Sequence, residues 1–208
     1  MTDVSVPPAS PLKLTTEEIA DLRRFADIVL RWNPRINLVS KSSAAEIWDR
    51  HILDSAQIFD LAPQSAESWI DLGSGGGFPG IVVAVIATRR RPALTVALVE
   101  SDQRKAVFLR QATRELGLKA TVLSQRIEKI ADLRADVVSA RALAALPELL
   151  ALASPLLADG GTCLFAKGAS RQQELDAARQ SWSFNVTEVP SITDPGAAIL
   201  RITEVHHV

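Results

Sequence analysis

The spacing of apolar residues along the chain changes between Phe59 and Trp69. Between Thr15 and Phe59, apolar residues recur every three to four positions, which is the period of a helix buried along one face. From Trp69 onward, short apolar runs alternate with segments of helical spacing. This alternation predicts an α/β fold in which helices cover both faces of a largely parallel sheet.

A first helix is expected to begin at Thr15, because Thr15 and Glu18 have the spacing of a capping box. Pro34 is expected to end it. The predicted buried stripe of this helix comprises Ile19, Leu22, Phe25, Val29 and Trp32.

A second helix is expected from Ser43, which repeats the capping-box spacing with Glu46, to about Phe59. The pair of helices is too small for a core of its own, so we expect it to dock on the segment that follows. The predicted buried stripe of the second helix comprises Trp48, Ile52, Ala56 and Phe59.

Five strands and a C-terminal antiparallel hairpin are expected after these helices. The strands are Trp69–Leu72, Leu94–Val99, Ala120–Leu123, Asp136–Ala140 and Thr162–Ala166, and the hairpin pairs Phe184–Val189 with Ala198–Val205. The expected helices between them span Ile81–Thr88, Gln103–Leu116, the stretch between Ala145 and Leu157, and about Ser170–Ser181.

The domain organisation predicted from this pattern has three parts. Residues 1–13 are expected to be a disordered lead-in, because the first eleven are rich in proline and serine and contain no apolar segment. Residues 14–62 are expected to form the N-terminal helices, and residues 63–208 a single structural unit.

Composition narrows the class of protein. Of 208 residues, 47% are apolar and 23% are charged, as in soluble globular proteins, and no apolar run approaches the ~18 residues of a membrane span. A single cysteine favours the reducing cytoplasm, and three histidines without ligand spacing argue against a metal site. The net charge of −1 gives no global signature of nucleic-acid binding, although a local basic patch remains compatible with it.

The glycine-rich stretch from Asp71 to Gly80 is the strongest chemical signal in the sequence. It contains five glycines and lies between the first predicted strand and an apolar helix. Glycine permits a tight turn and leaves the backbone accessible, and the helix N-terminus offers unpaired N–H groups. A nucleotide-like ligand is therefore expected over Gly73, Gly75 and Gly77, with Glu100 at the end of the second strand accepting hydrogen bonds from a ribose.

Two ligand classes fit this stretch, since Gly75, Gly77 and Gly80 also match a dinucleotide fingerprint. Asp71 would repel a pyrophosphate but suits the ammonium group of S-adenosylmethionine. The absence of tyrosine removes the Tyr–Lys chemistry of one large NAD-dependent family. S-Adenosylmethionine is therefore the expected cofactor, and the expected fold is a class I methyltransferase (Rossmann-like) sheet.

Other residues are expected at the same rim. Ile127 and Glu128 follow the third strand and are expected to border an adenine, and Arg141 follows the fourth strand. Basic residues concentrate on the loops at these strand ends and favour a phosphate-bearing acceptor. They are Arg104, Lys105, Arg126, Arg141 and Lys167, whereas Arg89–Arg91 is expected to be a solvated turn at the opposite end of the sheet.

Two motifs that the sequence lacks narrow the kinds of atom that could accept the methyl group. The fourth strand lacks the Asn/Asp-Pro-Pro-aromatic turn typical of exocyclic-amine methylation, and Cys163 lies inside a predicted strand, where a buried structural thiol is expected rather than a nucleophile. A ring nitrogen needs no general base, because it presents a lone pair. His51 and Asp54, three positions apart on the second helix, either orient a substrate or form a surface tether.

Several separated motifs, in order and in register, closely resemble the bacterial small-subunit ribosomal RNA guanine-N7 methyltransferases, the glucose-inhibited division protein B family. The resemblance covers nearly the whole chain from about Leu14. The motifs are Trp32-Asn33, Asn37-Leu38, Arg50 to Ser55, Gly73 to Gly80, Arg104-Lys105, Phe108 to Arg110, Ser139 to Ala142, and Lys167-Gly168.

This resemblance implies methyl transfer from S-adenosylmethionine to N7 of guanine-527 in 16S rRNA. We expect the substrate to be 16S rRNA within the 30S subunit or an assembly intermediate, and we expect the protein to be a monomer. It implies cofactor contacts at Gly73, Phe78, Glu100, Ile127, Glu128 and Arg141. It also suggests substrate-orienting roles for His51, Arg104, Arg126 and Lys167. A small-molecule methyltransferase and a non-enzymatic RNA-binding assembly factor of the same fold remain the alternatives.

Overall fold

The computed structural model describes residues 12–208. The expected disordered lead-in falls mainly on residues 1–11, which lie outside the described residues. Its last two residues contact the rest of the chain: Leu12 is buried, and the carbonyl of the exposed Lys13 accepts a hydrogen bond from Arg90. None of the helices within residues 12–208 is long and apolar enough to cross a membrane.

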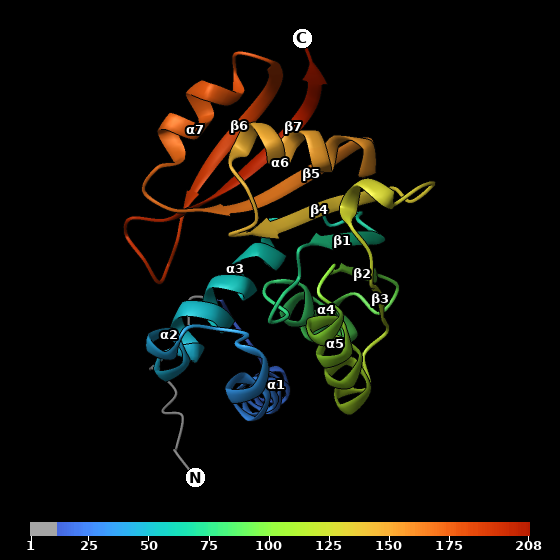
Figure 1. Cartoon of the computed structure of the whole chain (residues 1–208), viewed down its shortest axis with the longest axis vertical. Helices are drawn as coiled ribbons and strands as arrows, with labels where there is room; N and C mark the ends of the chain where they lie inside the picture. The colour runs from blue at the N-terminus through green and yellow to red at the C-terminus, as the bar shows by residue number, and fades with distance from the viewer. Residues whose placement is uncertain (1–11) are drawn as a thin grey trace.

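Seven strands form one sheet in the order β3-β2-β1-β4-β5-β7-β6 (Figure 1). β1 to β5 run parallel, and β7 pairs antiparallel with both β5 and β6. The mostly parallel sheet with a C-terminal antiparallel hairpin is therefore confirmed. The strands are β1 Ser68–Leu72, β2 Thr95–Val99, β3 Ala120–Leu123, β4 Ala135–Arg141, β5 Leu157–Lys167, β6 Trp182–Pro190 and β7 Ala198–His207.

Helices cover both faces of the sheet (Figure 1). Side chains alternate along the buried strands, so Trp69 of β1 and Val137 of β4 face one hydrophobic core while their neighbours Ile70 and Val138 face the other. The first core contains α4 and α5, and the second contains α6 and α7. The helices are α4 Gly80–Arg90, α5 Gln103–Leu116, α6 Leu146–Ala153 and α7 Arg171–Ala178, with short 3-10 turns η2 Ile127–Lys129 and η3 Ser154–Leu156.

The N-terminal helices share the first of these cores instead of forming their own. They are α1 Thr16–Ile36, α2 Lys41–Ala45, the π-helical turn η1 Trp48–Leu53, and α3 Asp54–Asp60. The capping box predicted at Thr15 and Glu18 is present. Phe25 of α1 contacts Phe78 of the glycine-rich loop with ring centroids 5.2 Å apart, so α1 supports that loop directly.

Two predicted boundaries are wrong. Pro34 lies inside α1, which ends two residues later because Asn37 adopts a left-handed conformation and caps it. The next helix is capped by Ser40, not Ser43, and helical structure is interrupted after Ala45 before it resumes in η1 and α3. The four predicted apolar positions of this region are nevertheless all buried, so the spacing identified the face correctly.

The run Arg89–Arg91 is not the solvated turn that the sequence suggested. Arg90 donates to both carboxylate oxygens of the fully buried Glu18, at 2.7 and 2.8 Å, and Arg91 lies over the Phe59 ring, 4.8 Å from its centroid. These arginines therefore tie the C-terminus of α4 to α1 and α3.

Gly80, the first residue of α4, has no room for a side chain. A Cβ there would lie 2.3 Å from Leu98 Cδ2 and 2.6 Å from Asp71 Oδ2. We expect Gly80→Ala to lower the free energy of unfolding by about 2–3 kcal/mol, measured by urea denaturation, because the surrounding core would be overpacked. Gly168→Ala, where a Cβ meets nothing within 4 Å, is the matched control. A Gly80→Ala protein as stable as the control would contradict the packing at this helix start.

Candidate functional site

Asp71 forms a buried hydrogen-bond network beneath the glycine-rich loop. Its Oδ1 accepts from Ser139 Oγ at 2.7 Å, and the same hydroxyl accepts from Trp69 Nε1 at 2.8 Å. Its Oδ2 accepts from the backbone N–H of Gly80 at 3.2 Å. The carboxylate thus joins β1 to β4 and caps the N-terminus of α4.

This network corrects one expectation about the loop. Asp71 is fully buried and lines neither of the two cavities described below, so it does not face a ligand's ammonium group. Gly80 N–H is likewise engaged by Asp71 and is not a free donor at the helix end. Burial raises the pKa of Asp71 to about 6, although the hydrogen bonds that it accepts oppose this shift.

The loop backbone requires glycine at Gly73, Gly75 and Gly77, which all have positive φ values. Gly73 and Gly75 line a cavity, whereas Gly77 turns toward the core and lies against Phe25 and Ile81. The three glycines predicted as a cradle therefore divide into two that line this cavity and one that permits packing.

A cavity of about 340 Å³ lies beside the loop, at the C-terminal ends of β1, β2 and β4. Glu100 lines it and brings the loop and the start of α5 together. Its Oε2 accepts from Gly75 N–H at 2.8 Å, and its Oε1 accepts from Asp102 N–H at 2.7 Å. A carboxylate has about four lone-pair positions, so each oxygen retains capacity for a further donor.

The rest of this smaller cavity combines predicted and unpredicted residues. Ile127, Glu128 and Arg126 line it, as the sequence suggested for the rim. Its apolar lining was not predicted, because those positions read as ordinary strand or helix interior in the sequence. It comprises Val99, Leu143 and Leu152, of which Leu143 covers the open side of Gly73.

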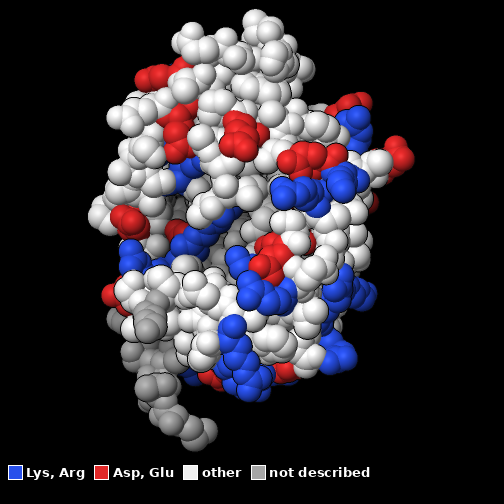
Figure 2. Space-filling view, viewed as in Figure 1, with Lys and Arg blue, Asp and Glu red and all other residues white. Residues whose placement is uncertain are grey.

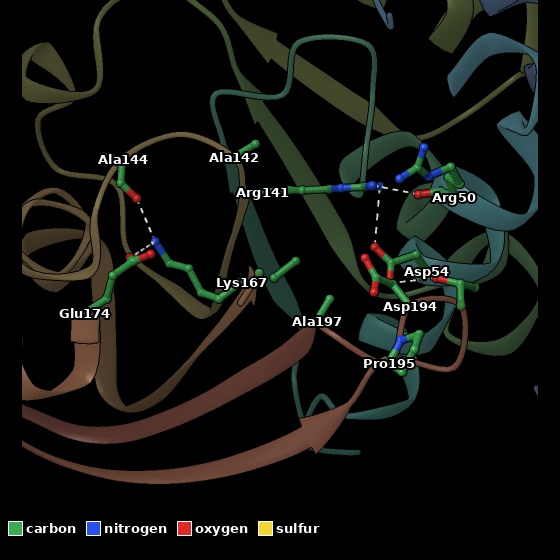
Figure 3. A pocket seen from close by; sticks show the side chains of 13 residues that line it. Arg50, Asp54, Arg141, Ala142, Ala144, Lys167, Glu174, Asp194, Pro195 and Ala197 are labelled. Atoms are coloured by element: carbon green, nitrogen blue, oxygen red, sulfur yellow. Dashed lines mark hydrogen bonds and ion pairs between the residues drawn. The ribbon is translucent and has the colours of Figure 1, made fainter. Parts of the chain in front are cut away.

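A second cavity of about 510 Å³ lies next to the first, and Ala142 and Ala144 line both. Figure 3 shows Arg141 extending across it toward Arg50 and Asp54. Arg141 Nη2 donates to the Arg50 carbonyl at 2.6 Å, and Nη1 lies 3.5 Å from Asp54 Oδ2. Arg141, predicted at the cofactor rim, thus lines the larger cavity and not the smaller one.

Lys167 borders the opposite part of the larger cavity (Figure 3). Its Nζ donates to Glu174 Oε2 at 2.7 Å and to the Ala144 carbonyl at 2.6 Å. Burial acts to raise the pKa of Glu174, but hydrogen bonds from Lys167 and Ser170 bring it below its ordinary value. Lys167 therefore holds the β4–α6 connection in place at the junction of the two cavities.

The turn between β6 and β7 closes the larger cavity, and α3 fixes it. Gln57 donates to the Pro190 carbonyl at 2.7 Å and accepts from Ile192 N–H at 3.1 Å. Asp54 Oδ1 accepts from Ser191 Oγ at 2.9 Å. No sequence signal linked these segments, because they are more than 130 positions apart.

The structure contradicts one of the two interpretations of His51, the surface tether. It is not tethered by Asp54: its ring stacks on Phe78 at a centroid distance of 4.9 Å, and within residues 12–208 neither ring nitrogen has a hydrogen-bond partner. Burial, together with the charges of Arg141 and Arg50, lowers its pKa to about 4, so the ring is neutral at pH 7. It lines neither cavity.

Basic side chains border a hollow near the middle of the face shown in Figure 2 and continue onto the surface below it. Arg104, at the start of α5, is 73% exposed and pairs only with Asp102 within the described chain. It lines neither cavity. Cys163 is fully buried and its thiol pKa is raised by burial, which confirms the expected structural thiol.

A family model described as "GidB: rRNA small subunit methyltransferase G" matches residues 18–201. The chain belongs to this family. A ribosomal RNA small subunit methyltransferase G from Cereibacter sphaeroides (strain ATCC 17025) is 50% identical over the full length of both chains. One from Ruegeria pomeroyi is 49% identical and covers 98% of this chain and 99% of its own. One from Acidiphilium cryptum is 54% identical, with 88% and 84% covered.

Solved structures similar to this methyltransferase G family member share its fold. An O-methyltransferase from Bacillus cereus, in complex with SAH, aligns with a TM-score of 0.57 at 15% identity and covers 87% of this chain and 91% of that chain. A B. subtilis M1A22 tRNA methyltransferase aligns with a TM-score of 0.54 at 13% identity and covers 73% and 64%. The predicted class I methyltransferase fold is thereby confirmed.

The raised pKa of Asp71 predicts a specific dependence of stability on pH. Between the ordinary value of 3.8 and about 6, the folded state holds a proton that the unfolded state has released. The stabilisation from this residue is therefore complete below about 3.8 and is lost as the pH rises through about 6. Asp71→Asn cannot titrate, so its unfolding free energy relative to wild type should rise by about 2–3 kcal/mol between pH 4 and pH 7.

Urea denaturation at several pH values measures this difference. Asp159→Asn, at an exposed position at the start of β5, is the control for removing one carboxylate. A difference between Asp71→Asn and wild type that does not change with pH would contradict the buried, proton-binding carboxyl.

Proposed function

We propose that this protein transfers a methyl group from S-adenosylmethionine to N7 of guanine-527 in the 16S rRNA. Family membership supports the reaction class, and one structural observation carries the mechanism. Two cavities of unequal size meet at Ala142 and Ala144, at the C-terminal ends of parallel strands, where ligands bind in open α/β sheets. The smaller suits the cofactor and the larger suits the acceptor base.

The residues of the smaller cavity fit S-adenosylmethionine. Glu100 holds the ribose hydroxyls through the lone pairs that Gly75 and Asp102 leave free. Apolar side chains beside it, including Val99 and Ile127, suit an adenine ring. At Gly75 the absence of a Cβ leaves the backbone open to close approach. When bound, the cofactor supplies a methyl group on a sulfonium, which leaves as a neutral thioether.

The larger cavity positions the acceptor. Guanine N7 has an exposed lone pair, so the chain needs no general base and contributes mainly by holding the base in line with the methyl carbon. Lys167 and Glu174 brace the Ala142–Ala144 connection that separates the two ligands. His51 is neutral and stacked on Phe78, and so acts by supporting the loop instead of by moving a proton.

An extruded nucleotide is the form of RNA that this arrangement favours. The N7 edge lies in the deep major groove of A-form RNA, which side chains cannot enter, so the target base must leave the stack. Exposed cations such as Arg104 and Arg126 are suited to the flanking phosphates. The protein would act as a monomer in the cytoplasm, on the 30S subunit or an assembly intermediate.

Tritiated methyl incorporation tests this proposal. Purified protein and labelled S-adenosylmethionine are incubated with 30S subunits and, separately, with naked 16S rRNA, and the modified nucleotide is mapped. We expect one labelled guanine, at position 527, carrying the methyl group at N7. Incorporation only into a free metabolite would indicate a small-molecule methyltransferase, and RNA binding without cofactor binding would indicate an assembly factor.

Glu100→Gln should weaken S-adenosylmethionine binding about ten- to a hundredfold in calorimetry, because the amide replaces one acceptor oxygen with a donor. Glu148→Gln removes a carboxylate that lines the same cavity and is the matched control. We expect that variant to bind within about threefold of wild type. Equal losses in the two variants would indicate a general effect of charge and contradict a ribose contact at Glu100.

A further inference from the structure

Arg104 lines neither cavity, and it begins a stripe of exposed side chains along α5. The members of the stripe follow one another at intervals of three or four residues, so they share one side of the helix. They are Arg104, Val107, Arg110 and Arg114. Lys105, in the first turn of α5, lines the smaller cavity, so the stripe leads away from that cavity over about 15 Å of helix.

The C-terminal half of α1 lies beside α5 and continues this stripe. Arg24 and Arg31 both reach Glu115 near the end of α5, the first at its backbone carbonyl and the second at its carboxylate. Further along α1, the ring centroid of Trp32 lies 5.9 Å from that of Phe108. The two helices therefore run antiparallel, and the end of α1 lies beside the first half of α5.

The two helices present an arginine face that nearby carboxylates neutralise only in part. The face comprises Arg24, Arg31 and Arg35 of α1 and Arg104, Arg110 and Arg114 of α5. Three of these arginines form ion pairs, which are Arg24–Asp21, Arg31–Glu115 and Arg104–Asp102.

The other three arginines of the face have no ion pair. In the part of the chain that the structure describes, the side chains of Arg35 and Arg110 have no hydrogen-bond partner, and the guanidinium of Arg114 bonds only to the neutral Gln111. Asp27 is a further exposed carboxylate on α1, and one carboxylate does not offset three cations. The face is therefore a local surplus of positive charge on a chain whose net charge is −1.

An RNA backbone is the partner that this face fits. Guanidinium groups bind phosphate through paired N–H donors, and phosphates repeat along a strand as the arginines repeat along the stripe. Val107, which is 51% exposed between Arg104 and Arg110, offers an apolar contact to a ribose or a base. In Figure 2 the basic side chains continue from the hollow onto the surface below it, where Figure 1 places α1 and α5.

We propose that the arginine face binds the phosphates of the 16S rRNA strand that flanks the target nucleotide. This inference rests on the proposed function, which supplies the RNA as the partner. Phosphate contacts fix the position of a nucleic acid without reading its sequence. The face therefore acts on RNA binding and not on the chemical step, so its loss should raise KM for the RNA while kcat is kept.

Arg110→Ala is the most direct variant, because the Arg110 side chain has no partner to lose within residues 12–208. Arg110→Lys keeps the charge. Arg179→Ala is the matched control, since Arg179 is an exposed arginine at the end of α7, on the other face of the sheet. Binding to naked 16S rRNA and to 30S subunits is measured at several salt concentrations with S-adenosylhomocysteine present, and methyl transfer is measured on both.

Arg110→Ala should weaken RNA binding about three- to tenfold at physiological salt. The slope of log affinity against log salt concentration should become shallower by about 0.7–0.9, because one phosphate contact is lost. Arg110→Lys should keep most of the wild-type slope, and Arg179→Ala should keep all of it. Replacing Arg35, Arg110 and Arg114 together by alanine should reduce the slope by about two to three. Affinity for S-adenosylmethionine should be unchanged in calorimetry.

The outcomes separate this inference from the proposed function. If wild type methylates the RNA and Arg110→Ala and the triple variant behave like Arg179→Ala, only the arginine face is overturned. Equal losses in Arg110→Ala and Arg179→Ala would also overturn it, because they indicate a general effect of charge. A loss on 30S subunits without one on naked 16S rRNA would assign the face to a ribosomal protein instead. RNA binding that follows the predicted slopes, without methyl transfer by wild type, would support the face and overturn the proposed function.

Discussion

The buried carboxylate of Asp71 is the constraint on which the site depends. It accepts hydrogen bonds from Ser139 on β4 and from Gly80 at the start of α4, and so it fixes the distance between two strands and the helix that follows the loop. A buried charged group without such partners would be strongly destabilising, so the network must form for the fold to be stable. The glycine-rich loop is thereby held between two fixed ends before any ligand binds.

The Asp71 network also determines how the two cavities are formed. Because the loop is held, Gly75 N–H reaches Glu100 and the two residues form one wall of the smaller cavity. On the other side of β4, Arg141 and the Ala142–Ala144 connection separate that cavity from the larger one. The N-terminal helices then complete the larger cavity, since Asp54 and Gln57 of α3 hold the β6–β7 turn. They therefore contribute to the wall of the larger cavity, which we propose as the acceptor site, as well as to the hydrophobic core.

The sequence predicted the parts of the fold that follow from local periodicity. The βα alternation, the terminal hairpin and the buried stripe of the second helix depend only on spacing, and the structure confirms them. The helix boundaries near Pro34 and Ser43 were wrong, because an Asn37 cap and a Ser40 cap prevailed over the expected proline stop and capping box. Capping residues and prolines near a helix end are sequence signals of similar strength. Tertiary contacts determine which of them sets the boundary.

The site was predictable in composition but not in geometry. The expected topology of the parallel sheet indicated that residues following the strand ends would lie at the site. Two of these residues, Glu100 and Ile127, do line the smaller cavity. The direction in which each side chain points was not available from spacing, so the sequence did not show that Asp71 lies beneath the loop or that Arg141 lines the larger cavity. Contacts between distant segments, such as Asp54 with Ser191, leave no trace in a single sequence.

A crystal structure of the protein with S-adenosylhomocysteine tests the central claim most directly. The account predicts that the ligand occupies the cavity bordered by Gly73, Gly75 and Glu100, with its ribose on Glu100, while the Asp71–Gly80 and Glu100–Gly75 hydrogen bonds remain in place. A ligand in the larger cavity, or a loop that refolds and breaks the Asp71–Gly80 bond to admit it, would contradict the account.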